Sequence, residues 1–297
     1  MIPIDPFLQE IPLTELKEAC FQLTENYLTG KWRLNYAAKI AYLAVRLPAT
    51  LAVMQRIFQE VPKGDSLLDF GAGPGTSSYG TDIEHITHVE HDPEFIEIGK
   101  KLHSRGSWTE NLPDQPHDIV LLSYSLGEIP ARQRCDLLEL LWERTKIALV
   151  VIEPGTPVGT ASMLEGRERI IQLGGSVHAP CPHSQACPLQ KPHWCHFSVK
   201  VERSALHRRL KEASLTYEEE KFAYCILTKE KLPALGTRIL HTPQKRKGHI
   251  NLTLCTDKGI EKRTISKRTK EAFRSAKKCS WGDLYQELQG EGISLSP

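Results

Sequence analysis

The chain has 297 residues, 40% of them hydrophobic, and a net charge of +2, which suits one large domain with appendages or two domains. Its eight cysteines are too sparse for a disulfide scaffold, and no apolar run reaches the roughly eighteen residues that span a membrane. Since residues 1–10 carry neither a secretory nor a mitochondrial leader pattern, we expect a reduced, cytoplasmic protein without a membrane partner.

Helical patterns open the chain. Apolar residues recur at helical spacing over 13–29 and again over about 35–60, where Pro48 should end or kink the helix. Residues 1–60 are therefore predicted to form an N-terminal helical region.

A short apolar strand, 66–70, then runs into three glycines at alternate positions: Gly71, Gly73 and Gly75. Glycines permit backbone angles denied to other residues and let a ligand approach the following helix. In the dinucleotide fingerprint the third glycine falls five residues after the first, where this chain has Thr76. Asp69 and the Gly-x-Gly-x-Gly spacing resemble motif I of the Rossmann-like methyltransferases, which implies binding of S-adenosyl-L-methionine.

The next strand, 86–90, ends in a carboxylate, Glu90, nineteen residues after Gly71. An acid at this spacing bonds the ribose hydroxyls in such nucleotide folds, and the alternative is an ordinary strand-end acid. We predict the ribose role for Glu90.

Two later apolar runs, 118–128 and 148–155, have the continuous hydrophobic character of strands covered on both faces, with a helix at about 131–144 between them. Alternating strands and helices imply a mainly parallel sheet with right-handed crossovers, so the predicted fold is α/β and Rossmann-like. Ligands bind at the carboxyl ends of such strands, where Ser123 and Tyr124 should lie.

A helix is expected at about 160–173, and a proline-rich stretch follows it. Three thiols fall within fifteen residues there: Cys181, Cys187 and Cys195. The prolines fix φ and remove amide donors, so the stretch should be a stiff loop. Cysteines can be small core residues, but no strand or helix periodicity surrounds these three, and their clustering indicates a metal site. The spacing alone leaves zinc and iron–sulfur open.

Beyond the loop, we expect a basic helix over 199–211, carrying Arg208 and Arg209, and the last strands of the sheet at 221–228 and 238–241. Residues 249–267 alternate strictly on either side of a turn at 256–259, which predicts a β-hairpin.

One cysteine of that hairpin differs from its neighbours. Ile250, Leu252 and Leu254 share one face of the strand, so Cys255 projects from the other face and could reach the thiols of the loop.

Positive charge gathers near the end of the chain. Between residues 238 and 278 there are thirteen Lys and Arg against three acids, a balance of +10 in a chain of net charge +2. Such a run is often a solvated face, but its bias favours nucleic acid. The candidate RNA-binding residues here are Lys245, Arg246, Lys247, Arg263, Lys267 and Arg268.

Several motifs together resemble the methyltransferase-like family of small-subunit ribosome assembly factors. They are the glycine loop, the cysteine loop, Arg46-Leu-Pro-Ala-Thr50, Glu153-Pro-Gly-Thr-Pro157, Tyr217-Glu-Glu-Glu-Lys-Phe222 and Trp281-Gly-Asp283. The similarity runs from about residue 35 to 283. It implies S-adenosyl-L-methionine at the glycine loop, a 4Fe-4S cluster, and 16S-type rRNA of the small ribosomal subunit as partner, for a protein that is a monomer off the ribosome.

Carried over to this chain, the resemblance makes Cys181, Cys187, Cys195 and Cys255 the cluster ligands, with zinc as the alternative metal and Cys279 as the alternative fourth ligand. The patterns along the chain predict three parts: a helical region (1–60), a methyltransferase domain (61–235) that carries the loop 180–197, and a basic extension (236–297). The lack of a leader pattern fits a bacterial member.

No motif identifies the methyl acceptor, so catalytic residues stay unassigned. Three alternatives are open: methylation of rRNA, methylation of a small molecule or protein, and a non-catalytic rRNA-binding assembly factor. A nicotinamide-dependent dehydrogenase is disfavoured by Thr76.

Overall fold

The computed structural model of the chain describes residues 2–29, 33–103, 105–189, 191–233 and 235–285. It divides into two compact units. The first comprises residues 1–149 and 199–220, and the second comprises residues 150–198 and 221–297.

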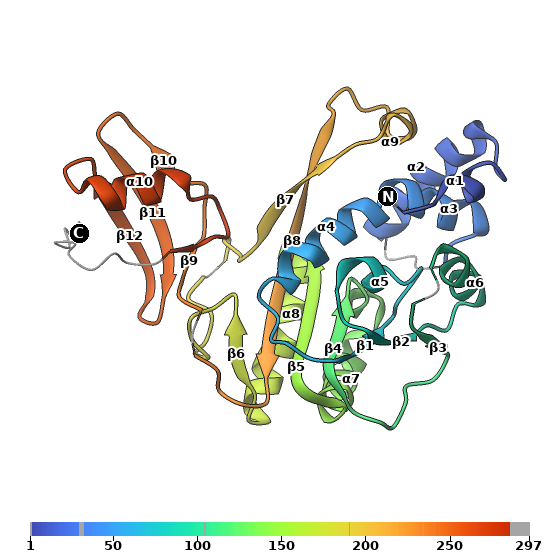
Figure 1. The fold of residues 1–297 in the computed structure, drawn as a ribbon, viewed down its shortest axis with the longest axis horizontal. Coiled ribbons are helices and arrows are strands. Elements are labelled where there is room, and N and C mark those ends of the chain that lie inside the picture. The colour runs from blue at the N-terminus through green and yellow to red at the C-terminus, as the bar shows by residue number, and fades with distance from the viewer. Residues whose placement is uncertain (1, 30–32, 104, 190, 234, 286–297) are drawn as a thin grey trace. The chain divides into compact units, whose positions relative to one another are not determined.

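Four helices begin the first unit (Figure 1): α1 (Asp5–Leu8), α2 (Leu13–Thr29), α3 (Tyr36–Val45) and α4 (Leu47–Phe58). The Asn35 side chain accepts the N–H of Ala38 at the start of α3, and Pro48 stands in the first turn of α4, where its missing N–H costs no helix bond. The predicted interruption at Pro48 is confirmed, because α3 and α4 are bent by 50° at the break.

A parallel sheet follows in the first unit. Its strands are β1 (Ser66–Phe70), β2 (His85–Val89), β3 (Ser107–Thr109), β4 (His117–Ser123) and the start of β5 (Thr145–Pro154), in the order β3-β2-β1-β4-β5. The connections carry α5 (Ser77–Gly80), α6 (Pro93–Leu102), a 3-10 turn (Leu126–Glu128) and α7 (Ala131–Glu143). Strand β1 runs parallel to both β2 and β4. The predicted Rossmann-like α/β fold is confirmed.

The register brings the carboxyl ends of three strands together. Phe70, the last residue of β1, is paired with Val89 on one side and with Leu122 on the other. The residues that follow these strands therefore emerge at one edge of the sheet.

Residues 199–220, called the arm below, also belong to the first unit. They contain most of β7 (Phe197–Glu202), all of α9 (Ala205–Leu210) and the start of β8 (Tyr217–Thr228). The predicted helix over 199–211 is wrong in its first half. Val199 and Val201 alternate with charged residues, a period of two that favours a strand, and only the stretch after the Ser204 N-cap is helical.

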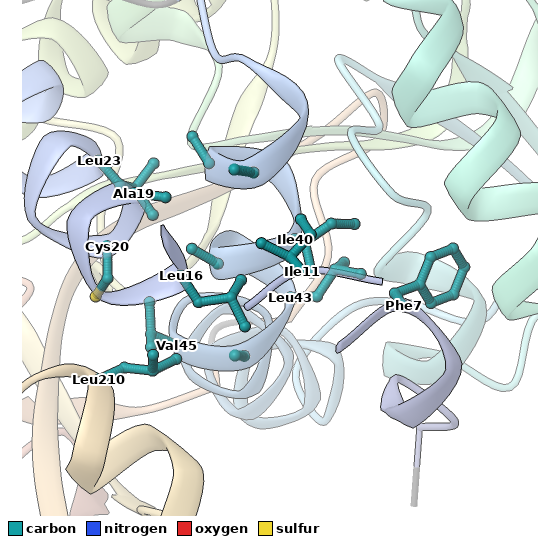
Figure 2. Packing of buried hydrophobic residues seen from close by; sticks show 14 of the residues in the cluster. Phe7, Ile11, Leu16, Ala19, Cys20, Leu23, Ile40, Leu43, Val45 and Leu210 are labelled. Carbon is teal, nitrogen blue, oxygen red and sulfur yellow. The ribbon is translucent and has the colours of Figure 1, made fainter. Parts of the chain in front are cut away.

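The helical core of the first unit is one buried cluster (Figure 2), in which Leu16, Ile40 and Leu43 are at most 2% exposed. It also takes in Leu210 of α9 and residues of α6. Apolar burial therefore holds the arm to the N-terminal helices.

The second unit contains α8 (Pro157–Gln172), β6 (Ser176–Ala179) and the ends of β5 and β8, with β8 antiparallel to β6. The strands β5, β6 and β8 belong to the same sheet as β1 to β4. A separate sheet of the second unit consists of β9 (Thr237–Ile239), β10 (Gln244–Lys245), β11 (His249–Thr256), β12 (Gly259–Ser266) and β13 (Leu284–Tyr285), and α10 (Lys270–Lys278) accompanies it. The placement of 238–241 in the first sheet was wrong, because β9 pairs with β11 and β13.

The hairpin of β11 and β12 is confirmed, with Thr256 paired to Gly259 across the turn. Ile250, Leu252 and Leu254 lie in the core of this sheet. Cys255 is buried on the opposite face, as the alternation predicts.

Among the described residues, no single helix is both long and apolar enough to cross a membrane; α3 and α4 meet that test only together, as a bent pair.

Candidate functional site

The glycine loop lies at the carboxyl edge of the parallel sheet. The backbone N–H groups of Gly71 and Ala72 both donate to the carbonyl of Val89, at 2.9 and 3.1 Å. Gly71 has φ of 69°, and a Cβ there would lie 2.8 Å from Cβ of Ser125, so a side chain is excluded by both conformation and space. Gly73 also has positive φ but faces open space, where a ligand can approach the backbone.

Glu90 contacts this loop directly. Its Oε2 accepts the N–H of Gly73 at 2.8 Å, and its Oε1 accepts the N–H groups of His91 and Asp92 at 2.9 Å. The carboxylate is therefore fixed by backbone donors beside the glycines before any ligand binds. Ser123, half-buried, ends β4 at the same edge.

Asp69 is placed differently. It is 3% exposed, accepts the hydroxyl hydrogen of Ser77 at 2.6 Å, and lies 3.5 Å from the Nδ1 atom of His88. The Ser77 contact ties β1 to the first turn of α5, and the His88 contact ties β1 to β2. Asp69 therefore positions the glycine loop indirectly, by holding Ser77, which follows the loop.

Tyr124, which the sequence predicts at this edge beside Ser123, and other residues that the sequence analysis did not single out complete the edge. Tyr124 has φ of 58°, a conformation that a bulky residue rarely adopts and that is concentrated at functional sites. Its hydroxyl donates to Glu220 at 3.4 Å, and Glu220 accepts two bonds of 2.9 Å from Arg46. Two motifs quoted above, which begin at Arg46 and at Tyr217, thus meet at Tyr124.

Glu128 adds a titratable group near the loop. Glu128 as a whole residue is exposed. Its carboxyl group is nevertheless partly desolvated, which raises its pKa to about 7, and the charge of Glu90 raises the pKa further. A carboxyl group with such a pKa exchanges protons near neutral pH.

A cavity of about 580 Å³ lies elsewhere in the first unit. Its lining includes Gln55, Lys63, Asp65 and Ile83, at the amino ends of β1 and β2. Ligands of open α/β sheets bind at the opposite edge, so we do not assign this cavity to the cofactor.

The second candidate site is the cysteine loop. Cys181, Cys187 and Cys195 are half-buried and Cys255 is 6% exposed. Burial raises the pKa of Cys195 well above its ordinary value, and three thiols raise it further: Cys181, Cys187 and Cys255. Burial, followed by Cys181 and Cys187, raises the pKa of Cys255 to about 12. The four thiols therefore lie within electrostatic reach of one another.

As these side chains stand, no group of three His, Cys, Asp or Glu residues in the described ranges could hold a metal ion. The Sγ atom of Cys255 lies 3.9 Å from Nε2 of His183. The surroundings of Cys279 differ from those of the other four thiols. Burial and the charge of Asp283 raise its pKa, and the charge of Lys245 lowers it. The ligand set thus stays a prediction.

The loop is held by α8 and the residues before it. Trp194 donates its indole N–H to the carbonyl of Gly155 at 2.9 Å, and the Thr160 hydroxyl donates to the carbonyl of Cys195 at 3.2 Å. The motif that begins at Glu153 is therefore the support of the cysteine loop.

Two arginines at this site were not predicted. Arg167 and Arg238 are each 1% exposed, and both donate to backbone carbonyls of the loop. Cys225 is a buried core residue near this site: burial raises its pKa, Arg167 lowers it, and Cys181 raises it.

The predicted RNA-binding residues divide between the units. Lys245, Arg246, Lys247, Lys267 and Arg268 are exposed in the second unit. Arg263 is half-buried, donates to Glu261 at 2.9 Å and lies over the ring of Tyr285. Arg208 and Arg209 belong to α9 of the first unit, where Arg209 is exposed.

A model of the family described as "Mitochondrial small ribosomal subunit Rsm22" matches residues 36–286. The chain belongs to this family. The matched range contains both the glycine loop and the cysteine loop, so the two sites are parts of one Rsm22-type chain.

Curated relatives agree. The chain is 27% identical over 304 residues to "Ribosome assembly protein METTL17, mitochondrial" of Homo sapiens, covering 88% of this chain and 66% of the relative. It is 24% identical over 335 residues to "Rsm22-cox11 tandem protein 2, mitochondrial" of Schizosaccharomyces pombe, covering 87% and 44%. The chain thus spans less than two thirds of the length of these relatives.

These names correct one expectation. Because the human and yeast relatives are mitochondrial, the prediction of a cytoplasmic location is wrong, and the relatives point to mitochondria instead. They also give no support to the assignment as a bacterial member.

Among solved structures, the chain is similar to the plantazolicin methyltransferase BpumL with a desmethylPZN analogue and SAH, at TM-score 0.41 and 12% identity, covering 74% of this chain and 98% of that one. Magnesium protoporphyrin IX methyltransferase of Synechocystis PCC 6803 aligns at TM-score 0.38 and 8% identity, covering 61% and 77%.

Proposed function

We propose that this Rsm22-family protein is a ribosome assembly factor that binds S-adenosyl-L-methionine, a 4Fe-4S cluster and rRNA of the small subunit. The observation that carries the proposal is the family match over residues 36–286, which includes both candidate sites. Relatives in Homo sapiens and Saccharomyces cerevisiae are named ribosome assembly proteins.

The cofactor part rests on the carboxyl edge of the sheet. Gly71 approaches Ser125 too closely for a side chain, Gly73 faces open space, and Glu90 is already fixed beside them. An acid at this position suits the ribose hydroxyls, and the open space at Gly73 lets the ligand approach the loop backbone. We assign the cofactor to Asp69, Gly71, Gly73, Gly75, Glu90 and Ser123, with Asp69 acting through Ser77.

The cluster part rests on four thiols within electrostatic reach of one another: Cys181, Cys187, Cys195 and Cys255. Four thiolates are the ligand set of a 4Fe-4S cluster, and zinc remains the alternative. Cys255 is favoured over Cys279 because the loop thiols influence its pKa. When bound, the metal centre would supply the folding free energy that joins the loop to β11.

The rRNA part rests on the basic extension, 236–297. Its exposed cations at Lys245–Lys247 and at Lys267 and Arg268 suit a phosphate backbone. Arg263 contributes less, because it already contacts Glu261.

A second candidate function is methyl transfer, to rRNA or to a small molecule or protein. The observations that favour it are the left-handed backbone of Tyr124 and the raised pKa of Glu128 at the carboxyl edge of the sheet.

One experiment separates these functions. The purified protein is incubated with labelled S-adenosyl-L-methionine and, in parallel, with rRNA, immature small subunits and an RNA-depleted extract. Association with immature small subunits, weakened by salt, is expected. No association at any salt concentration would contradict the assembly role. Label in rRNA alone supports an RNA methyltransferase, and label only in the depleted extract supports another acceptor.

A further inference from the structure

Two basic segments of the second unit meet at one end of the sheet of β9 to β13. The backbone N–H of Lys267, just after β12, donates to the carbonyl of Gly248 at 2.9 Å, and that of Arg246 donates to the carbonyl of His249 at 2.9 Å. The turn between β10 and β11 therefore lies against the end of β12. We call this place the basic end. Its cations, all exposed, are Lys245, Arg246, Lys247, Lys267, Arg268 and Lys270.

The cations of the basic end are available to a ligand. None of them makes an ion pair within the part of the chain that the structure describes. Residues 244–249 and 266–270 also contain no acid. Arg263, farther along β12, differs because it contacts Glu261. A group of cations without neutralising partners attracts the phosphates of a nucleic acid.

A polar strip adjoins the basic end on the face of β11 and β12 that is turned away from α10. Ile250 of β11 packs with Ala272 of α10 in the apolar core, so α10 covers the other face. The side chains of the strip are exposed or half-buried: Asn251, Thr264 and Ser266. Asn251 accepts the hydroxyl hydrogen of Thr264 at 2.9 Å. Such amide and hydroxyl groups can bond sugar hydroxyls and phosphate oxygens.

Aromatic rings are packed away in this part of the chain. Phe273 packs against the apolar core, and Tyr285 is 4% exposed, with Arg263 over its ring. Proteins that bind single strands stack the bases on exposed aromatic side chains. Among the described residues of the basic end, the imidazole of His249 is the one exposed ring. The basic end therefore suits phosphates better than unpaired bases.

Strand spacing also fits a double helix. Lys245 belongs to β10 and Lys267 follows β12, and these two strands pair with opposite edges of β11. Neighbouring strands are about 4.8 Å apart, so the two basic segments lie about 10 Å apart across the sheet. The major groove of A-form RNA is deep and narrow, so cations of one surface can reach the phosphates of both strands.

We propose that the basic end binds double-helical RNA through phosphates on the two sides of the narrow major groove, while the polar strip contacts sugar hydroxyls. The basic end recognises the shape of the helix and not its base sequence. This inference rests on the rRNA partner of the proposed function and names the kind of rRNA segment that the basic end takes.

The test uses the purified full chain and three probes: an RNA duplex of about 20 base pairs, longer than the roughly 16 that a duplex-binding domain spans, one of its strands alone, and the DNA duplex of the same sequence. The RNA duplex should bind at least about tenfold tighter than either other probe, a difference of about 1.4 kcal/mol. An RNA duplex of scrambled sequence should bind equally well. Equal or tighter binding of the single strand would overturn the inference.

Two exposed lysines at opposite ends of β12 provide a matched pair of variants. Lys267→Gln removes a cation of the basic end, and Lys258→Gln removes one at the hairpin turn. Lys267→Gln should weaken duplex binding and reduce the slope of log affinity against log salt by about 0.9, the effect of one lost phosphate contact. Lys258→Gln should change neither. Equal losses in the two variants would show a general charge effect and contradict the inference.

His249→Ala removes the exposed ring and should keep the preference for duplex. Loss of that preference in His249→Ala would show that a stacked base carries it, which would also overturn the inference. Failure of the proposed function looks different. A protein that binds neither RNA probe nor immature small subunits contradicts the rRNA partner itself. Binding to immature subunits without any preference for duplex contradicts only the present inference.

Discussion

The two candidate sites are built in opposite ways. At the glycine loop, the backbone N–H groups are already hydrogen-bonded. Those of Gly71 and Ala72 donate to the carbonyl of Val89, and that of Gly73 donates to the carboxylate of Glu90. At the cysteine loop, burial and the neighbouring thiols raise the pKa of Cys195 and of Cys255. The first site is therefore ordered without its ligand, whereas at the second we propose that a metal centre binds the thiols as thiolates. Ligand removal should affect the second unit much more than the first.

The largest expected effect comes from the cysteines. Cys181→Ser or Cys195→Ser should abolish iron binding and make residues of the second unit sensitive to protease, because metal binding contributes directly to folding. Cys255→Ser should do the same, while Cys20→Ser and Cys135→Ser keep the iron. Iron content and limited proteolysis are the measurements. Full iron in Cys255→Ser together with loss in Cys279→Ser would mean that the fourth ligand is Cys279.

The glycine loop provides the converse test. Gly71→Ala places a Cβ 2.8 Å from that of Ser125 on a backbone with φ of 69°. Strain of this kind costs about 1–3 kcal/mol, and binding of S-adenosyl-L-methionine should fall by at least about tenfold while iron content is unchanged. Calorimetric titration measures the binding. Gly248→Ala, at a glycine with open space and no positive φ, is the control.

A third change addresses the basic extension. Replacing Lys245, Arg246 and Lys247 by glutamine should weaken binding to small-subunit rRNA and reduce the slope of log affinity against log salt by about 2–3, since each lost phosphate contact contributes about 0.9. The control replaces three exposed lysines of the first unit: Lys63, Lys100 and Lys101. Equal loss in both triple variants would show only a general charge effect.

The smallest effect concerns stability of the first unit. Burial opposes ionisation of Glu218, but His207, whose Nε2 lies 3.5 Å from the carboxylate, together with Lys211 and Arg203 outweighs it and lowers its pKa to about 2. A lowered folded-state pKa adds stability above the ordinary value of about 4.3, and this stability is lost as pH falls toward 2.

Glu218→Gln should therefore cost about 2 kcal/mol at pH 6 and progressively less on acidification. Thermal unfolding of wild type and variant between pH 2 and 6 measures this. A difference that does not narrow at low pH would contradict the assigned role of the carboxylate.

Local patterns predicted much of this molecule from sequence. The spacing of Gly71, Gly73 and Glu90 follows from the local backbone of a strand–turn–helix unit, so it can be recognised in the sequence. The alternation around Cys255 follows from strand geometry and can be recognised in the same way. Pro48 marked a helix boundary for the same reason.

Tertiary contacts were not visible in this way. Arg167 and Arg238 lie on elements far apart in sequence, and nothing in their neighbourhoods distinguishes a buried arginine from a solvated one. The strand at 199–202 was missed because the charged stretch after Ser204 dominated the pattern. The link between Arg46 and Glu220 likewise joins residues 174 positions apart.

The central claim is that the cysteine loop and Cys255 hold a 4Fe-4S cluster. Metal analysis of wild-type protein purified without oxygen tests it most directly. The account predicts a brown protein with broad absorption near about 400 nm, about four irons per chain and little zinc. Stoichiometric zinc without iron would contradict it.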